Sequence, residues 1–323
     1  MALVEKSKSA AQPLLATSVF DKGNFPFKCI TEETPCSSCF DSSAPPKPLL
    51  IVTPTVTGTY PVIVLLHGFY LRNYFYQDLL QHIASHGYIA VAPQLYGYVP
   101  STGPEEIDSG AKVINWLAKG LQSLLPENVV PDFTKFALSG HSRGGKAAFA
   151  LALGRAKTAL SLKFSVLIGI DPVAGANQHC RIRPHILTYE PQSFSLSIPV
   201  TVIGTGLGPE KKNACMSQPC APNGVNHNDF FYECKPPCAH FVVKDYGHMD
   251  MLDDDPPGLV GALSGCMCKN GTGPKELMRK TVGGIVVAFL KAYLNGEDED
   301  LVAIVEDPAV SPAKLEPVEF IRA

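Results

Sequence analysis

A serine nucleophile is indicated by the pentapeptide GHSRG at 140–144. The pattern G-x-S-x-G places its serine on a sharp turn between a strand and a helix, with the hydroxyl exposed above a sheet. Gly140 and Gly144 lack a Cβ atom, so the turn can close tightly. Apolar residues at 136–138 predict the strand, and an Ala-rich run after the pentapeptide predicts the helix. We therefore expect Ser142 to carry nucleophilic chemistry rather than to serve only as a turn residue.

A general base must take the proton from such a serine, and the chain offers nine histidines. Hydrolases built on this turn carry the base last in chain order, after the nucleophile and the acid. His248 fits because it lies just past the apolar run 240–244. His240 lies inside that run, and His227 lies in an irregular region. We expect His248 to be the base.

The acid that orients the base has three candidates. Asp171 stands at the end of the apolar run 166–170, directly before Pro172. Glu210 follows the next apolar run, and Asp250 lies close to His248 in sequence. We favour Asp171 because it emerges directly from an apolar strand end, where a carboxylate is expected only if it has a function. The alternative for Asp171 is a turn-capping role before proline.

Two backbone N–H groups should bind the oxyanion that forms during ester or amide cleavage. One belongs to Arg143, the residue after the nucleophile, and the other to Phe69, which follows His67-Gly68 after a predicted strand. We expect His67 to shape this oxyanion loop rather than to exchange protons. Aromatic residues gather beside it and could line an apolar substrate pocket or belong to the core: Phe69, Tyr70, Tyr74 and Phe75.

The surrounding pattern alternates strands with helices, which predicts an α/β fold with a mostly parallel, doubly wound sheet. Short apolar runs predict strands at 49–53, 62–66, 88–92, 133–138, 164–170, 198–203 and, as the last strand, 240–244. Helical spacing predicts helices at 75–85, 108–125, 140–153 and 281–294.

The ends of the chain and two internal stretches do not follow this alternation. We expect an N-terminal arm or short edge strands over 1–45, a catalytic domain over 46–295, and an acidic, extended tail over 296–323. Residues 206–237 and 253–275 are rich in Gly, Pro and Cys, which is typical of lids or binding loops.

Ten cysteines are distributed unevenly, with six between 215 and 268 and none in the predicted strands. We expect some of these six to pair and to brace loops around the active site. A structural zinc site is the alternative for Cys36-x-x-Cys39 and for the group Cys234, Cys238 and His240. The first group lacks a matching second pair, so we expect no metal.

The amino-acid composition restricts the possible classes of function further. Apolar residues make up 46% of 323 residues, which allows a sizeable core. Lys and Arg number 27 against 30 for Asp and Glu, so no basic excess favours nucleic-acid binding. No apolar run approaches the ~20 residues that span a bilayer. The N-terminus lacks a secretory segment, and Lys6 and Lys8 indicate only a weak transit peptide.

Several longer strings resemble the plant chlorophyllases, over about residues 46–314. They are HGFYLRN at 67–73, GHSRGG at 140–145, GIDPVAG at 169–175, PHILTY at 184–189, DYGHMDMLD at 245–253 and GCMCKNG at 265–271. The resemblance implies an α/β-hydrolase fold and a serine esterase that cleaves the phytyl ester of chlorophyll, giving chlorophyllide and phytol. The family's Ser, Asp and His fall on Ser142, Asp171 and His248, which favours Asp171 over Glu210.

The resemblance also implies the surroundings of the reaction. No cofactor is required, since the magnesium belongs to the chlorophyll substrate. We expect a chloroplast location, with the cytosol or other internal membranes as alternatives, and peripheral contact with membranes that hold chlorophyll. Two rival hypotheses are an esterase or lipase acting on another lipid or small ester, and an inactive hydrolase fold that binds a pigment or hormone.

Overall fold

Among the residues that the structure describes, nine strands form one sheet whose middle is parallel and whose edges are antiparallel. The computed structural model describes residues 17–34, 44–97, 99–213, 218–254, 256–258, 261 and 267–322. In spatial order the strands are β1 (Phe27–Glu32), β2 (Leu49–Pro54), β4 (Ile89–Pro93), β3 (Gly58–Leu66), β5 (Val129–His141), β6 (Val166–Ile170), β9 (Val200–Thr205), β10 (Cys238–Val243) and β11 (Leu315–Ile321). Strands β4, β3, β5, β6, β9 and β10 run parallel, as the sequence predicts. A separate small hairpin pairs β7 (Gly175–Asn177) with β8 (Cys180–Arg181).

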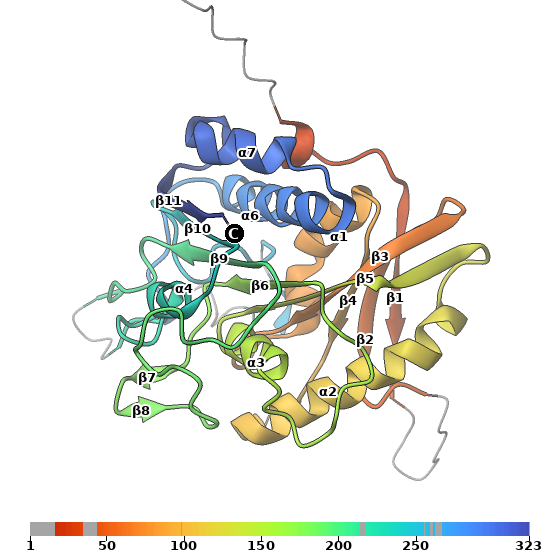
Figure 1. The fold of residues 1–323 in the computed structure, drawn as a ribbon, viewed down its shortest axis with the longest axis horizontal. Coiled ribbons are helices and arrows are strands. Elements are labelled where there is room, and N and C mark those ends of the chain that lie inside the picture. Colours follow the sequence, from red (N-terminus) through yellow and green to blue (C-terminus); the bar gives the residue numbers. More distant parts are fainter. Residues whose placement is uncertain are drawn as a thin grey trace, which may run out of the picture.

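Helices cover both faces of this sheet (Figure 1). One face carries α1 (Gln77–Ser85), α6 (Lys275–Leu290) and, packed on α6, α7 (Glu299–Glu306). The other face carries α2 (Gly103–Gly120), α3 (Arg143–Ala152) and α4 (His227–Glu233). Short 3₁₀ turns lie at Ser18–Phe20, Asn73–Tyr76, Leu121–Leu124 and Pro308–Val310, and a π turn at Lys291–Asn295 extends α6.

Alternation along the strands builds two separate hydrophobic cores. In β3, Val62, Val64 and Leu66 enter the core beneath α2 and α3, while Ile63 and Leu65 enter the core beneath α1 and α6. Successive side chains of a strand point to opposite faces, so a continuous apolar run fits a sheet covered on both sides. This explains why the sequence located the central strands correctly.

The C-terminal segment differs from the expected extended tail. It forms α7 and then β11, which pairs antiparallel with β10, so 240–244 is not the last strand. Leu301 and Ile304 of α7 and Leu315 at the start of β11 are buried in the core beneath α6. Acidic residues are compatible with a helix here, because Glu299 and Asp300 stand in the first turn of α7, where negative charge is favourable. The domain boundaries themselves stay a prediction.

The stretch 206–237 also differs from an irregular lid, since it contains α4. Asn226 and Asp229 form a reciprocal capping box at the start of this helix, a signal that the sequence carried. Phe230 is fully buried against Phe149, with ring centroids 4.9 Å apart. This part of the stretch is therefore core.

Replacing Ile304 with alanine tests whether the C-terminal segment belongs to the fold. Ile304 is 0% exposed, so the Ile304→Ala variant should lose about 2–5 kcal/mol of unfolding free energy through the cavity it leaves. Val302→Ala, on the half-buried side of the same helix, is the matched control and should cost far less. Urea unfolding of both variants provides the measurement, and equal stabilities would show that α7 does not contribute to the core.

Candidate active site

The carboxyl ends of neighbouring parallel strands bring the candidate residues to one edge of the sheet. Ser142 follows β5, Asp171 follows β6, and His248 lies on the loop after β10. Parallel strands end at a common edge, which is where open α/β sheets place their sites. Residues separated by up to 106 positions along the chain therefore meet there.

Ser142 occupies the strained turn that the pentapeptide predicts. Its φ is 57° and its ψ is −125°, a backbone conformation that residues other than glycine rarely adopt. A Cβ atom at Gly140 would lie 2.3 Å from the Gly144 carbonyl oxygen, and one at Gly144 would lie 2.2 Å from the Leu66 carbonyl oxygen. Only glycine allows these approaches, so both glycines are needed for the turn.

A continuous hydrogen-bonded chain joins Ser142, His248 and Asp171. The Ser142 hydroxyl lies 2.8 Å from Nε2 of His248, and Nδ1 of His248 lies 2.7 Å from Oδ2 of Asp171. The carboxylate fixes the tautomer: Nδ1–H donates to Asp171, which leaves the Nε2 lone pair to accept the serine proton. This is the geometry of an activated nucleophile.

Asp171 is 1% exposed, yet its surroundings favour the ionised form. Burial alone would raise its pKa, but hydrogen bonds from His248 and Thr205 and the nearby His227 hold the pKa below its ordinary value. The Thr205 hydroxyl donates to Oδ2 at 2.6 Å. Sequence reasoning missed Thr205, although its place at the end of β9 could have indicated it.

The other two candidate acids have different surroundings. Oδ2 of Asp250 accepts the backbone N–H groups of Gly247 at 2.7 Å and Gly271 at 2.6 Å, so this carboxylate braces the loop that carries His248. Glu210 is exposed. Among the three candidates, Asp171 is the one whose carboxylate contacts the His248 ring.

The loop after β3, residues 67–72, lies against Ser142 and is termed the oxyanion loop. A Cβ atom at Gly68 would lie 3.1 Å from the Cβ of Ser142. Nδ1–H of the buried His67 donates to the Gly68 carbonyl at 2.9 Å, and Nε2 accepts the Leu95 N–H at 3.0 Å. Burial lowers the pKa of His67 to about 4, so the ring is neutral near pH 7. His67 shapes the loop, as expected.

The Arg143 side chain connects the oxyanion loop with α2. Its Nε–H donates to the buried Glu106 carboxylate at 2.6 Å, and its guanidinium also reaches the Ser101 carbonyl. The guanidinium lies 5.1 Å from the ring centre of Phe69 and 5.7 Å from that of Tyr96, within range of cation–π attraction. The oxyanion roles of the Phe69 and Arg143 N–H groups stay a prediction.

The four candidate pocket aromatics separate into two groups. Phe69, Tyr70 and Tyr74 are 46%, 47% and 43% exposed, which is unusual for large apolar side chains next to one site. Phe75 is 0% exposed and belongs to the core beneath α1, so the expectation that it faces a substrate pocket is wrong. The 3₁₀ turn at Asn73–Tyr76 directs neighbouring rings to opposite sides.

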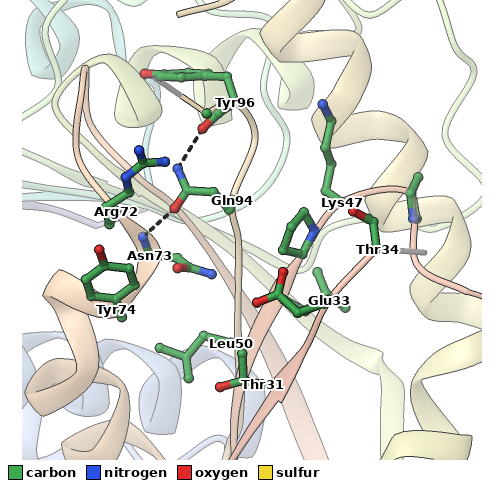
Figure 2. Close-up of a pocket in the computed structure, with 14 residues that line it drawn as sticks. Thr31, Glu33, Thr34, Lys47, Leu50, Arg72, Asn73, Tyr74, Gln94 and Tyr96 are labelled. Atoms are coloured by element: carbon green, nitrogen blue, oxygen red, sulfur yellow. Dashed lines mark hydrogen bonds between the residues drawn. The ribbon is translucent and has the colours of Figure 1, made fainter. Parts of the chain in front are cut away.

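A cavity of about 530 Å³ lies beside the oxyanion loop, between this loop and the start of β2. Figure 2 shows Gln94 between the backbones of Asn73 and Tyr96, where it accepts the Asn73 N–H at 2.9 Å and donates to the Tyr96 carbonyl at 2.8 Å. Leu50 and Tyr74 contribute apolar surface to the cavity wall, and Glu33, Lys47 and Arg72 contribute charged groups (Figure 2).

Two of the six cysteines between 215 and 268 pair, as expected, and their bracing role stays a prediction. Cys220 and Cys268 form a disulfide that joins the two irregular stretches flanking His248. The predicted strands contain no cysteine, but the structure adds β1, which holds Cys29, and begins β10 two residues earlier than predicted, at Cys238. Among the described residues, no group of three or more His, Cys, Asp or Glu side chains could hold a metal ion. Cys36 and Cys39 lie outside the described residues.

Comparison with known proteins agrees with this geometry. A family model described as chlorophyllase matches residues 15–322. The chain belongs to the chlorophyllase family. It is 56% identical to chlorophyllase-1 of Arabidopsis thaliana over 98% of this chain and 96% of that protein. It is 49% identical to chlorophyllase-2 of the same plant, over 89% and 92% of the two chains, and 48% identical to chlorophyllase-1, chloroplastic, of Citrus unshiu, over 100% and 97%.

Membership of the chlorophyllase family is consistent with the rest of the molecule. The family comprises carboxylic ester hydrolases of the α/β-hydrolase fold, and the sheet described above has that fold. The chloroplastic designation of the Citrus relative supports the expected chloroplast location. In the part of the chain that the structure describes, every helix is too short or too polar to cross a bilayer.

Breaking the disulfide tests whether it braces this chlorophyllase site. The bond closes a loop of 48 positions, so the Cys220→Ser variant should lose about 4 kcal/mol of stability in the chain-entropy treatment. Cys180→Ser, at an exposed free thiol, is the control and should leave stability unchanged. Thermal unfolding with and without reductant provides the measurement. A wild-type protein equally stable in both conditions would contradict the bracing role.

Buried neutral histidines predict lower stability in mild acid. Burial lowers the pKa of four histidines from the ordinary 6.5, to about 4 for His67 and His82 and to about 3 for His141 and His240. Below pH 6.5 the unfolded chain takes up protons that the folded protein cannot. The stability that these groups contribute is thus present above pH 6.5 and is lost as the pH falls toward their folded pKa values.

Some buried carboxyl groups act in the opposite direction. Burial raises the pKa of Glu106 and of Asp253 to about 7, so their contribution to stability is present at low pH and is lost as the pH rises through 7. Because burial lowers the pKa of more histidines than the carboxyl groups whose pKa it raises, we expect a lower free energy of unfolding at pH 5 than at pH 7. Urea titrations at the two pH values measure this, and a higher stability at pH 5 would contradict it.

Proposed function

We propose that Ser142 hydrolyses the phytyl ester of chlorophyll through a covalent intermediate. The observation that carries the proposal is the Ser142–His248–Asp171 hydrogen-bonded chain at the carboxyl edge of the sheet. Family membership supports the substrate, because the relatives are named chlorophyllases over nearly their full length.

The first half of the reaction forms the acyl-enzyme. His248 Nε2 takes the Ser142 proton as Oγ attacks the carbonyl carbon of the propionate ester. The ionised Asp171 stabilises the imidazolium through Nδ1–H. The tetrahedral intermediate collapses, the C–O bond to phytol breaks, and His248 returns the proton to the leaving phytol oxygen. Chlorophyllide remains attached to Ser142 as an ester.

The second half releases the acid. His248 removes a proton from water, and the resulting hydroxide attacks the acyl carbon. Collapse of the second tetrahedral intermediate breaks the bond to Oγ, and the proton passes from His248 to Ser142. The net change is one water consumed, with chlorophyllide and phytol formed. No group outside this chain and its substrate is required, since the magnesium belongs to chlorophyll.

The backbone N–H groups of Phe69 and Arg143 bind the oxyanion in both halves. The close approach of Gly68 to Ser142 and the position of Arg143 at the first residue of α3 support this assignment. Positive charge of the helix dipole at this end of α3 adds to it. In other enzymes, removing one such donor costs about 2.7–4 kcal/mol of transition-state stabilisation.

The exposed aromatic residues serve the apolar part of the substrate. Phe69, Tyr70 and Tyr74 stand at the entrance of the site with more than two fifths of their surface free. They provide a contact for the phytyl chain and for the membrane that holds chlorophyll. The adjoining cavity of about 530 Å³, with Tyr74 and Leu50 in its wall, has room for part of a hydrocarbon chain.

The Ser142→Ala variant tests the catalytic assignment. Release of chlorophyllide should fall more than about a thousandfold, because the attacking oxygen is absent. A fluorophosphonate should label the wild-type protein at Ser142 and leave the variant unlabelled. Ser165→Ala, at a half-buried serine of another strand end, is the matched control. Wild-type turnover by Ser142→Ala would overturn the mechanism.

A substrate comparison tests the remaining alternatives. We expect wild-type protein to turn over chlorophyll far faster than triacylglycerol. Rapid cleavage of triacylglycerol or of a short p-nitrophenyl ester, without chlorophyllide release, would identify a different esterase. Pigment binding without fluorophosphonate labelling would identify a binding protein.

A further inference from the structure

A second buried hydrogen-bonded chain crosses the site behind Ser142. Nε2 of His141 lies 3.0 Å from the backbone carbonyl oxygen of His248, and Nδ1 of His141 lies 2.9 Å from the Tyr76 hydroxyl. The same hydroxyl accepts the backbone N–H of Gly68 at 3.0 Å. The chain thus runs from the oxyanion loop to the loop that carries the catalytic base.

The position of each proton in this chain follows from its ends. A carbonyl oxygen only accepts, so His141 must carry its proton on Nε2 and donate to His248. Nδ1 of the neutral ring then has a lone pair, so Tyr76 must donate to it. The remaining lone pairs of the Tyr76 oxygen accept the Gly68 N–H. One arrangement of protons satisfies every donor and acceptor in this hydrogen-bonded chain, so no donor can exchange its role with an acceptor.

Burial fixes this arrangement. Tyr76 and His141 are both 0% exposed. Burial lowers the pKa of His141 to about 3, and the nearby His248 adds to this, so the ring stays neutral when His248 becomes charged. Burial also raises the pKa of Tyr76, which keeps its hydroxyl protonated. A buried donor or acceptor that loses its partner costs free energy, so these hydrogen bonds resist disruption.

His141 also supports the base through its ring. The ring centres of His141 and His248 are 4.6 Å apart, with an interplanar angle of 35°. His248 is thus held at three places: its Nδ1 by Asp171, its backbone carbonyl by His141, and its ring face by the His141 ring. The first contact fixes the tautomer, and the other two hold the backbone and the ring face of His248.

The backbone on either side of Tyr76 is tied to the same histidine loop. Asp253 accepts the Gln77 N–H at 3.0 Å and the Asp78 N–H at 3.1 Å through its carboxylate, and its own N–H donates to the Phe75 carbonyl at 2.9 Å. The backbone at Tyr76 is therefore fixed relative to the loop that carries His248. The Tyr76 hydroxyl thus contacts Gly68 from a fixed position.

We propose that Tyr76 and His141 are positioning residues that set the distance between the catalytic base and the oxyanion donor of Phe69. Gly68 immediately precedes Phe69, so the hydroxyl that holds the Gly68 N–H also holds the donor beside it. The inference rests on the proposed function, because it concerns the same serine esterase site. One hydroxyl thereby links the loop of the base, which transfers the proton, with the loop of the N–H group that binds the oxyanion.

The Tyr76→Phe variant removes the hydroxyl and keeps the ring. Both the Gly68 N–H and His141 Nδ1 lose their partner, so we expect kcat to fall about 10- to 100-fold, less than the loss of an entire oxyanion donor. KM should change less than about threefold, because Tyr76 is buried and does not touch substrate. Tyr88→Phe, a buried tyrosine on the α6 side of the sheet, is the matched control and should keep wild-type kcat.

Substitutions of His141 separate positioning from a general packing role. Glutamine can donate to the His248 carbonyl as Nε2–H does, whereas leucine fills similar space without a donor. We expect His141→Gln to retain at least tenfold more kcat than His141→Leu. In a double-mutant cycle, Tyr76→Phe combined with His141→Leu should cost no more than the worse single change, since both break one chain. Equal activity of the Gln and Leu variants would overturn the inference, as would an unchanged kcat in Tyr76→Phe.

A short p-nitrophenyl ester and the fluorophosphonate labelling rate provide readouts that do not depend on chlorophyll. If the wild-type protein neither cleaves the p-nitrophenyl ester nor reacts with the fluorophosphonate, the proposed function fails. If wild-type protein reacts and the Tyr76 and His141 variants react equally fast, only this inference fails. If Tyr76→Phe does not fold, the comparison of His141→Gln with His141→Leu decides.

Discussion

The hydrogen bond between Asp171 and His248 is the interaction on which the site depends. A carboxylate that is 1% exposed would ordinarily take up a proton, and a neutral carboxyl group would not hold the imidazole in the tautomer that accepts the serine proton. Hydrogen bonds from His248 and Thr205 keep Asp171 ionised. The Thr205 hydroxyl and Nδ1 of His248 must therefore both reach Oδ2 of Asp171, and much of the surrounding structure positions them there.

The sheet meets this requirement because it is covered on both faces. Cores beneath α1 and α6 on one side and beneath α2 and α3 on the other hold the parallel strands in fixed register. Its carboxyl edge can then carry strained residues, such as Ser142 with φ 57° and Asp171 with φ 40°. Strain of this kind persists only where the neighbouring structure determines the backbone, as the paired strands do here.

The loops around the site combine rigid support with an apolar entrance. Asp250 and the disulfide between Cys220 and Cys268 support the loop after β10, and Asp253 ties that loop to the start of α1. The exposed rings of Phe69 and Tyr70 lie on the oxyanion loop, where Phe69 is next to the Arg143 guanidinium. Such an arrangement suits an esterase whose substrate is large and apolar: the reacting groups stay fixed while the surface presented to the substrate remains open.

The sequence by itself determined the turn at Ser142, the chain order that selects His248, and the central strands. These features depend on local spacing and on the rule that parallel strands end at one edge. Asp171 needed the family resemblance to exclude Glu210. The tertiary structure alone decided which cysteines pair, that residues 299–321 complete the core and the sheet, and that Phe75 is buried while Phe69 is not. It also decided that Tyr76 reaches His141, 65 positions away, and that His141 reaches His248, a further 107 positions along. Local patterns specify elements and turns, whereas contacts between distant side chains depend on how the elements pack, which spacing along the chain does not encode.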